Sequence, residues 1–377
     1  MTIDDVNTGL GVGDILSSES CQYCVLELMG SGVYGQVAKC LNKTTKEMVA
    51  VKVFCNTGGI HEARWELHFL RKICHFNHPN LVRFIEEFKY KGIPCLVLEI
   101  LHNDMFRTVK NQEWEVQLNK IRLIAKQLFM AMNALSEAGI VHCDLKPDNI
   151  MFVSKEQRKI KLIDFGLSLL SSRVRPGVML QATSYRAPEI LLGLPFDHGI
   201  DLWGTGCILA FLYLRCNLFR ARFGYETVRQ VVQLLGQPED HLLCQGIYTR
   251  KYFLEEEGGD GPTWRLKTPE EYMSGTHEKI RTDIRNCKYQ CLDDLVHIYP
   301  LRSPADHEDR RQFVDLLKCL LTVNSEKRIS SSRALQHPFI MMSHLLDPGY
   351  ESYLCDSMEM MSSCNEENPS KPKLPKS

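Results

Sequence analysis

The stretch Val141-His142-Cys143-Asp144-Leu145-Lys146-Pro147-Asp148-Asn149-Ile150-Met151 governs the interpretation of the whole sequence. Four polar side chains with catalytic potential, those of His142, Asp144, Lys146 and Asn149, fall within eight residues and are bracketed by apolar ones. Such a segment is typical of a loop held between two buried elements. The alternative is a plain surface turn, because Lys-Pro-Asp-Asn also has the composition of a turn. Sequence elsewhere in the chain distinguishes the two.

The side chains of this loop suit phosphoryl transfer. Asp144 can accept the proton of an attacking hydroxyl, and Lys146 can neutralise the charge of the transferring phosphoryl group. Asn149, five positions after Asp144, can ligate a divalent cation. Asp144, Lys146 and Asn149 are therefore our candidate catalytic residues, and Asn149 is also a candidate metal ligand.

Length and composition are those of an ordinary folded protein. The chain has 377 residues, of which 44% are hydrophobic and 24% charged, which is enough for a sizeable core and more than one structural unit. The formal net charge of −1 gives no argument for binding to nucleic acid or to a membrane surface. The longest fully apolar run, residues 207–214, is too short to cross a bilayer. We expect no direct partner of either kind.

Fifteen cysteines are many, but the number is odd and the chain is large. The first five residues are acidic and lack the apolar core of a signal peptide. We interpret the cysteines as reduced thiols in an intracellular protein of the nucleus or the cytoplasm, not a secreted one. Cys21 and Cys24 have the spacing of half a zinc site, but no second pair matches it, so two thiols at a strand edge are favoured over a metal.

A glycine-rich segment lies between two strand-like runs. Residues 25–29 predict a strand that meets Gly30-Ser31-Gly32-Val33-Tyr34-Gly35, and the runs 37–40 and 48–54 predict the next strands. The G-x-G-x-x-G pattern alone is weak evidence, because in dinucleotide-binding folds it opens a helix. Here it joins two strands. Such a hairpin can lie over nucleotide phosphates, since glycine has no Cβ to keep the backbone away.

Lys52 lies within the apolar, β-branched run 49–53. If it is buried, its ammonium needs a carboxylate partner, whereas an exposed strand lysine would need none. A helix is predicted over about residues 60–73, and Glu66 shares its apolar stripe with Phe69, Leu70 and Ile73. A glutamate on that stripe is out of place unless it is paired. We therefore expect Glu66, and not Glu62, to pair with Lys52; the alternative is a solvated helix residue.

The rest of the chain alternates between strand-like and helical patterns. Strands at 81–88 and 95–101 complete a small lobe of five strands and one helix, with a hinge at 102–104. Helical stripes follow at 121–135 and 313–321. A short strand at 159–163 leads into Asp164-Phe165-Gly166, twenty residues after Asp144. Asp201 opens a helix that is apolar all round and therefore buried, and we expect it to cap that helix and to pin the catalytic loop.

Six signatures occur in the order found in eukaryotic protein kinases, and the resemblance covers about residues 23–342: the glycine loop, the strand lysine, the helix glutamate, the catalytic loop, Asp-Phe-Gly and Ala187-Pro188-Glu189. The resemblance implies an α+β, bilobal kinase fold, with a small antiparallel β-sheet lobe containing one helix and a large, mainly helical lobe. We accordingly divide the chain into a flexible tail (1–19), a kinase domain (20–342) and a disordered tail (343–377). The domain comprises lobes at 20–102 and 103–342, with an insert at about 220–305.

ATP and Mg²⁺ are the cofactors that this resemblance implies. Lys52 would hold the α- and β-phosphates, and Asp164 would chelate the magnesium together with Asn149. The backbone of Glu99 and Leu101 would read the adenine edge, although the apolar members of the site are equally explained as core. Glu189 is expected to form a structural bridge with Arg328. The full set of expected cofactor-binding residues is Met29, Gly30, Ser31, Gly32, Val33, Tyr34, Gly35, Val37, Ala50, Lys52, Glu66, Leu98, Glu99, Leu101 and Met151.

Three further segments resemble homeodomain-interacting protein kinases, within the branch that holds cyclin-dependent, MAP and dual-specificity tyrosine-regulated kinases. They are Leu180-Gln181 with residues 185–196, then residues 264–269, and residues 344–347. That family implies a serine/threonine kinase, often acting before proline, with protein substrates such as transcriptional regulators; we expect a monomer. The alternative is a pseudokinase that serves as a binding scaffold, but Lys52, Asp144, Asn149 and Asp164 are all present, which favours the active enzyme.

The activation segment departs from the family in two respects. Met179 occupies the position of an autophosphorylated tyrosine, and the arginine that would meet the phosphate is missing from Gln181-Ala182-Thr183-Ser184. Cys143 likewise offers no cation to a phosphate. We hypothesise that tyrosine autophosphorylation is lost and that packing, in place of phosphate pairing, holds this segment.

Overall fold

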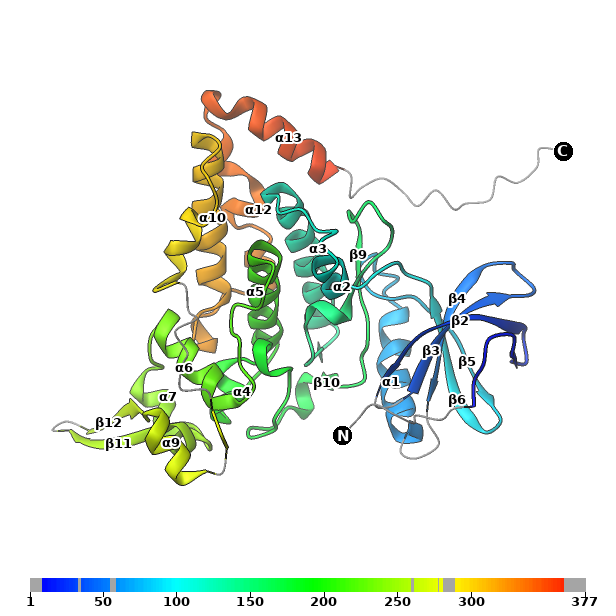
Figure 1. Cartoon of the computed structure of the whole chain (residues 1–377), viewed down its shortest axis with the longest axis horizontal. Coiled ribbons are helices and arrows are strands. Elements are labelled where there is room, and N and C mark those ends of the chain that lie inside the picture. Colours follow the sequence, from blue (N-terminus) through cyan, green and yellow to red (C-terminus); the bar gives the residue numbers. More distant parts are fainter. Residues whose placement is uncertain are drawn as a thin grey trace.

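The computed structural model of the protein describes residues 9–32, 35–54, 59–258, 261–276, 278–280 and 289–362. A small lobe built on one sheet stands beside a larger, mainly helical lobe (Figure 1). The predicted α+β fold of two lobes is therefore confirmed.

The sheet of the small lobe is antiparallel, in the order β1-β2-β3-β4-β6-β5. Val49, Val51 and Val53 of β4 are buried and alternate with the less buried Ala50 and Lys52, so one face joins the core and the other faces the large lobe. The bounds are β1 (Ile15–Ser17), β2 (Gln22–Gly32), β3 (Gly35–Asn42), β4 (Met48–Phe54), β5 (Phe84–Tyr90) and β6 (Ile93–Glu99).

Helix α1 (Gly59–Cys74) packs against this sheet. Its buried residues include Phe69, Leu70 and Ile73, with Glu66 on the same face, as the helical stripe predicts. The strand predicted over 81–88 begins only at Phe84. Residues 81 and 82 instead cross to the large lobe, where the Val82 amide donates to the Leu162 carbonyl at 3.0 Å. The two lobes are thus joined here as well as at the hinge.

The large lobe is built around α5, in which every residue from Ile200 to Tyr213 is buried, as predicted. The principal elements of the large lobe are α2 (Met105–Lys110), α3 (Leu118–Glu137), β7 (Ile140–Val141), β8 (Ile150–Phe152), β9 (Ile160–Leu162), β10 (Leu169–Leu170), α4 (Pro188–Leu192), α5 (Gly199–Leu214), α6 (Gly224–Leu235), α7 (Asp240–Gln245), α8 (Thr249–Tyr252), β11 (Phe253–Gly258), β12 (Gly261–Leu266), α9 (Pro269–Gly275), α10 (Pro304–Leu320), α11 (Ser331–Ala334), α12 (Pro338–Met341) and α13 (Glu351–Ser362). The region predicted as an insert forms α6 to α9 and the β11–β12 hairpin.

Two predicted polar anchors are found in the large lobe. Glu189 and Arg328 form a buried, two-pronged ion pair with N···O distances of 2.6 and 2.9 Å. The Asp201 carboxylate accepts the amide protons of His142 and Cys143 at 2.7 and 3.0 Å, so it pins the catalytic loop. The expectation that Asp201 also caps α5 is wrong, because the N-cap is His198 and Asp201 lies inside the first turn.

The prediction of a flexible segment up to residue 19 is wrong for its described part. Residues 15–17 form β1, which pairs with β2, and Leu10 and Leu16 are buried against the sheet. The small lobe therefore has six strands, one more than predicted. A three-residue strand with one buried side chain leaves too short a pattern to detect in a polar stretch. Residues 1–8 lie outside the described residues.

The prediction of a disordered segment after residue 342 is also wrong for its described part. Helix α13 packs on α3 (Figure 1), and the Tyr353 hydroxyl donates to the buried carboxylate of Asp309 at 2.8 Å. Arg122 and His344 contact the same carboxylate. The helix is stabilised by this polar contact more than by an apolar stripe, since its buried residues are only Ser357 and Met361. Residues 363–377 are outside the described part.

The cysteines and the helix lengths bear on two expectations drawn from the composition. The twelve cysteines among them are all free thiols. No helix in the described ranges has the length and apolar character needed to cross a bilayer.

Candidate active site

A cleft of about 810 Å³ lies between the two lobes and brings most of the predicted site residues together. It is walled by the glycine-rich hairpin, β4, α1, the hinge and the catalytic loop. Val33 and Tyr34 lie outside the described residues, as does the surrounding of Gly32, while Asn149 is not in the cleft wall. The predicted residues in the wall are Met29, Gly30, Ser31, Gly35, Val37, Ala50, Lys52, Glu66, Leu98, Glu99, Leu101, Asp144, Lys146, Met151 and Asp164.

Lys52 lies at the back of the cleft between two carboxylates. Its Nζ is 2.6 Å from the Glu66 Oε2 and 3.4 Å from the Asp164 Oδ1, which confirms the predicted Lys52–Glu66 pair. Burial alone would lower the pKa of Lys52, but the two carboxylates outweigh it and raise the pKa above its usual value. The site therefore holds a fixed ammonium charge, which can meet the oxygens of an anionic ligand.

The catalytic loop places two polar side chains, those of Lys146 and Asn149, against Asp144. Lys146 Nζ donates to the Asp144 Oδ2 at 2.6 Å, and the Asn149 Nδ2 donates to the same oxygen at 2.9 Å and to the Asp144 carbonyl at 2.8 Å. Asn149 is thus buried behind Asp144 and orients its carboxylate. Cys143 has a φ of 67°. This conformation is held in place because the amides of His142 and Cys143 both donate to the Asp201 carboxylate.

Asp164 faces Lys52 across the cleft in an equally constrained backbone, with a φ of 61°. Burial would raise the pKa of Asp164, but Lys52 and then His142 hold it below its usual range, so this carboxylate is ionised at neutral pH. Gly166 follows closely: a Cβ there would stand 3.2 Å from the Asp164 Oδ1. A side chain at that position would crowd the carboxylate.

The donor set fits Mg²⁺. Magnesium prefers oxygen ligands, typically one or two protein groups together with phosphate oxygens. Asp164 offers an ionised carboxylate that is 42% exposed. Asn149 uses its Nδ2 on Asp144, so its amide oxygen is the atom that can ligate a cation.

Several cleft residues escaped the sequence analysis. Val82 and Ile163 line the cleft but read as ordinary strand core, although the position of Ile163 directly before Asp164 could have identified it. Asp104 and Asp148 also line the cleft. Trp65 donates its indole N–H to the Ser168 carbonyl at 2.9 Å and so ties α1 to the segment after Asp-Phe-Gly; no periodicity reveals a contact over such a separation.

The activation segment is fixed by side-chain contacts at its C-terminal end. Arg186 donates from Nε to the Leu180 carbonyl and from Nη2 to the Gln181 carbonyl, both at 2.7 Å. Gln181 has a φ of 64°, and its buried amide bonds the Ile200 carbonyl and the Ala187 N–H, each at 2.9 Å. Because Ile200 directly precedes the residue that pins the catalytic loop, one turn of α5 holds both segments in register.

The tip of the segment is held by packing. The Tyr248 hydroxyl donates to the Gly177 carbonyl at 2.7 Å, and a Cβ at Gly177 would meet the Ile247 side chain at 3.1 Å. Met179, where the resembling family has an autophosphorylated tyrosine, is 46% exposed. A hydrogen bond and a close side-chain approach thus fix this part of the segment, and the role of a phosphate stays a hypothesis.

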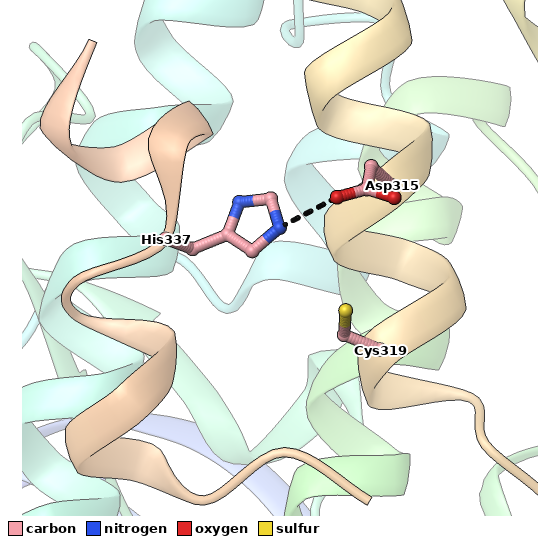
Figure 2. Close-up of side chains that lie close together, drawn as sticks. All are labelled: Asp315, Cys319 and His337. Carbon is pink, nitrogen blue, oxygen red and sulfur yellow. Dashed lines mark hydrogen bonds and ion pairs between the residues drawn. The ribbon is translucent and has the colours of Figure 1, made fainter. Parts of the chain in front are cut away.

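Outside the cleft, the described residues include one group with metal-ligand chemistry, formed by Asp315 and Cys319 of α10 and by His337 (Figure 2). The His337 Nδ1 accepts the Phe339 amide proton at 3.2 Å, so Nε2 carries the ring proton and donates it to Asp315 at 3.1 Å. A metal at Nε2 would have to displace that proton. We therefore interpret the contact as a helix cap braced by a carboxylate.

The chain is similar in sequence to known protein kinases. A model of the protein kinase domain matches residues 23–340. The chain is 37% identical over 363 residues to homeodomain-interacting protein kinase 1 of Mus musculus and 33% identical over 367 residues to the protein of the same name in Caenorhabditis elegans. These alignments cover 93% and 92% of this chain but 30% and 43% of those proteins, so the chain spans less than half of either.

A shorter relative gives a similar result. Serine/threonine-protein kinase ppk15 of Schizosaccharomyces pombe is 33% identical over 352 residues, covering 89% of this chain and 66% of that protein. The resemblance to homeodomain-interacting protein kinases, inferred from Leu180-Gln181 with residues 185–196 and from residues 264–269 and 344–347, is confirmed by these identities.

Proposed function

This chain belongs to the protein kinase family, and on that premise we propose that it is a catalytically active, ATP-dependent serine/threonine kinase. The observation that carries the proposal is the convergence of Lys52, Asp144 and Asp164 in one cleft, with Lys52 held by Glu66 and Asp144 by Asn149. A pseudokinase scaffold, the alternative, would not need all three charges in place.

The chain's own residues would divide the work as follows. Asp144, with Oδ2 held by Lys146 and Asn149, would accept the proton of the substrate hydroxyl. Lys52, fixed by Glu66, would hold the phosphates in line with that hydroxyl. Asp164 and the Asn149 amide oxygen would hold Mg²⁺, which when bound neutralises charge on the phosphates. Catalysis would come from positioning and charge neutralisation.

The activation segment supports a preference for proline after the phosphoacceptor. An extended substrate lying along residues 180–181 would present the backbone N–H of its next residue to carbonyls that Arg186 already occupies. A buried N–H without an acceptor costs about 1–3 kcal/mol. Proline has no N–H and avoids this cost. Proline direction would therefore arise by exclusion of other residues.

The same segment supports activity without a phosphate. Tyr248, Gln181 and Arg186 supply the contacts that would otherwise require a phosphotyrosine and its arginine. We include in the proposal an intracellular protein, nuclear or cytoplasmic, that acts as a monomer on regulatory proteins. The relatives' name, homeodomain-interacting protein kinase, supports transcriptional regulators as candidates.

Radiolabelled ATP and a generic serine peptide test the proposal, with Asp164→Asn as the inactive variant. Loss of the metal-binding carboxylate should lower the rate by about a thousandfold or more, which corresponds to several kcal/mol of barrier. Asp356→Asn, which changes an exposed carboxylate on α13, is the matched control and should retain full activity. Equal background transfer by the wild type and Asp164→Asn would support the scaffold.

A further inference from the structure

A second cavity, of about 680 Å³, lies next to the catalytic cleft and shares Val82 and Glu99 with its wall. It is formed where residues 77–84 pass between the end of α1, helix α3 and the β8–β9 hairpin. Its size falls within the range of about 300–1,000 Å³ found for ligand sites. The functions proposed above for the cleft residues make no use of it.

The lining of this cavity is cationic. It contains four cationic side chains, those of Arg83, Lys126, Lys159 and Lys161, and a single carboxylate, that of Glu99. The Glu99 Oε1 is held by Lys161 at 2.6 Å and by the Arg83 amide at 2.6 Å, so its charge is already committed. Lys161 is neutralised by Glu99 in turn, so Arg83 and Lys126 supply positive charge to the lining, whereas the whole chain has a net charge of −1.

Part of the cavity lining is apolar. Ile73, Leu81 and Val82 are buried there, and Met130 and Val153 are half-buried beside them. A phosphate or another small anion would pair with the cationic side chains but leave this apolar surface uncovered. A chain that carries both carboxylates and aliphatic side chains complements the two together.

Two buried amides of the lining are already hydrogen-bonded, so this part of the cavity is preformed. Asn80 and Gln127 are both buried, and the Asn80 Nδ2 donates to the Gln127 Oε1 and to the Ile160 carbonyl, each at 2.9 Å. Gln127 also donates to the Arg158 carbonyl at 2.8 Å and accepts the Ile160 N–H at 3.0 Å. Two amides thus lock three chain segments together, and little ordering would be required on binding.

From these features we propose that the cavity is a docking site for an acidic segment of substrate proteins that also carries aliphatic residues. Its occupant would be held at the junction of the lobes while a separate part of the same substrate reached Asp144. The consequence for substrate selection rests on the proposed kinase function, whereas the binding itself does not.

Binding is tested on the full chain by the fluorescence anisotropy of a labelled peptide of alternating glutamate and leucine. The wild type should bind it, and Arg83→Glu with Lys126→Glu should weaken binding by about tenfold or more. Lys89→Glu with Lys155→Glu, two exposed lysines outside the cavity, is the matched control and should bind as the wild type does. If charge reversal unfolds the protein, Arg83→Gln with Lys126→Gln should give a smaller loss in the same direction.

Three results would overturn the proposal: no binding by the wild type, equal binding by the cavity variant, or equal binding of a glutamate–glycine peptide, which would indicate a simple anion site. Kinetics separate this idea from the proposed function. A substrate fused to the acidic segment should show a raised KM in the cavity variant, while a short substrate without it should be unaffected. Peptide binding by a chain that transfers no phosphate would refute the kinase proposal and leave the docking site standing.

Discussion

Arg186→Met offers a sharp test of how the activation segment would select its substrate. Methionine keeps much of the side-chain bulk but removes the donors that occupy the Leu180 and Gln181 carbonyls at 2.7 Å. In the wild type, a peptide with alanine after the phosphoacceptor leaves an N–H without an acceptor, whereas a proline peptide does not. The free-energy cost of about 1–3 kcal/mol corresponds to a preference for proline of about 5- to 150-fold in kcat/KM.

In the variant the two carbonyls become available, so the alanine peptide should gain and the preference should fall towards unity. Both peptides compete in one reaction, and mass spectrometry measures the ratio of their products. This ratio is independent of how much enzyme is folded. Arg175→Met, at an exposed arginine of the same segment, is the control and should keep the wild-type ratio.

A third peptide separates hydrogen bonding from ring shape. N-methylalanine lacks the N–H but has no pyrrolidine ring, so the wild type should accept it nearly as well as proline. If the wild type rejects N-methylalanine as strongly as alanine, or if Arg186→Met keeps the full preference for proline, the hydrogen-bond argument is refuted.

Three further predictions follow from contacts elsewhere. Tyr248→Phe removes one hydrogen bond to the activation segment, worth about 0.5–1.5 kcal/mol, so phosphatase-treated protein should lose about two- to tenfold in activity and its segment should be cleaved faster by protease; unchanged values would count against packing as the hold. Glu66→Gln breaks the ion pair with Lys52 and should lower kcat/KM by about 10- to 150-fold in steady-state assays; an undiminished rate would show that the pair is dispensable. Tyr353→Phe leaves the buried Asp309 short of a donor and should reduce the free energy of unfolding in urea by about 1.5–3 kcal/mol; no change would mean that α13 is not anchored there.

The sequence was most informative where a charge interrupts an apolar pattern. Glu66 on the stripe of α1 and Lys52 in a β-branched strand each required a partner, and that requirement identified the pair before the structure placed the atoms 2.6 Å apart. The Glu189–Arg328 bridge was anticipated instead from the resemblance to protein kinases. A charge in the core has few ways to be satisfied, so its presence constrains the fold strongly.

Sequence reasoning failed where short elements depend on distant polar contacts. Helix α13 is attached through Tyr353 to a carboxylate forty-four residues earlier, and β1 buries only Leu16 among its three residues. Neither leaves a periodic signal. The clamp of Arg186 on two carbonyls is a property of backbone direction, since it depends on the positive φ of Gln181, which the residue types alone do not encode.

The proposed activity requires that Lys52 and Asp164 hold a magnesium-bound triphosphate between the lobes. Calorimetric titration of the full chain with ATP, with and without Mg²⁺, tests it most directly. The wild type should bind ATP more tightly when Mg²⁺ is present, Asp164→Asn should lose that dependence on metal, and Lys52→Met should lose affinity under both conditions. A wild-type chain that binds no ATP with Mg²⁺ present, or variants that bind as the wild type does, would contradict the account.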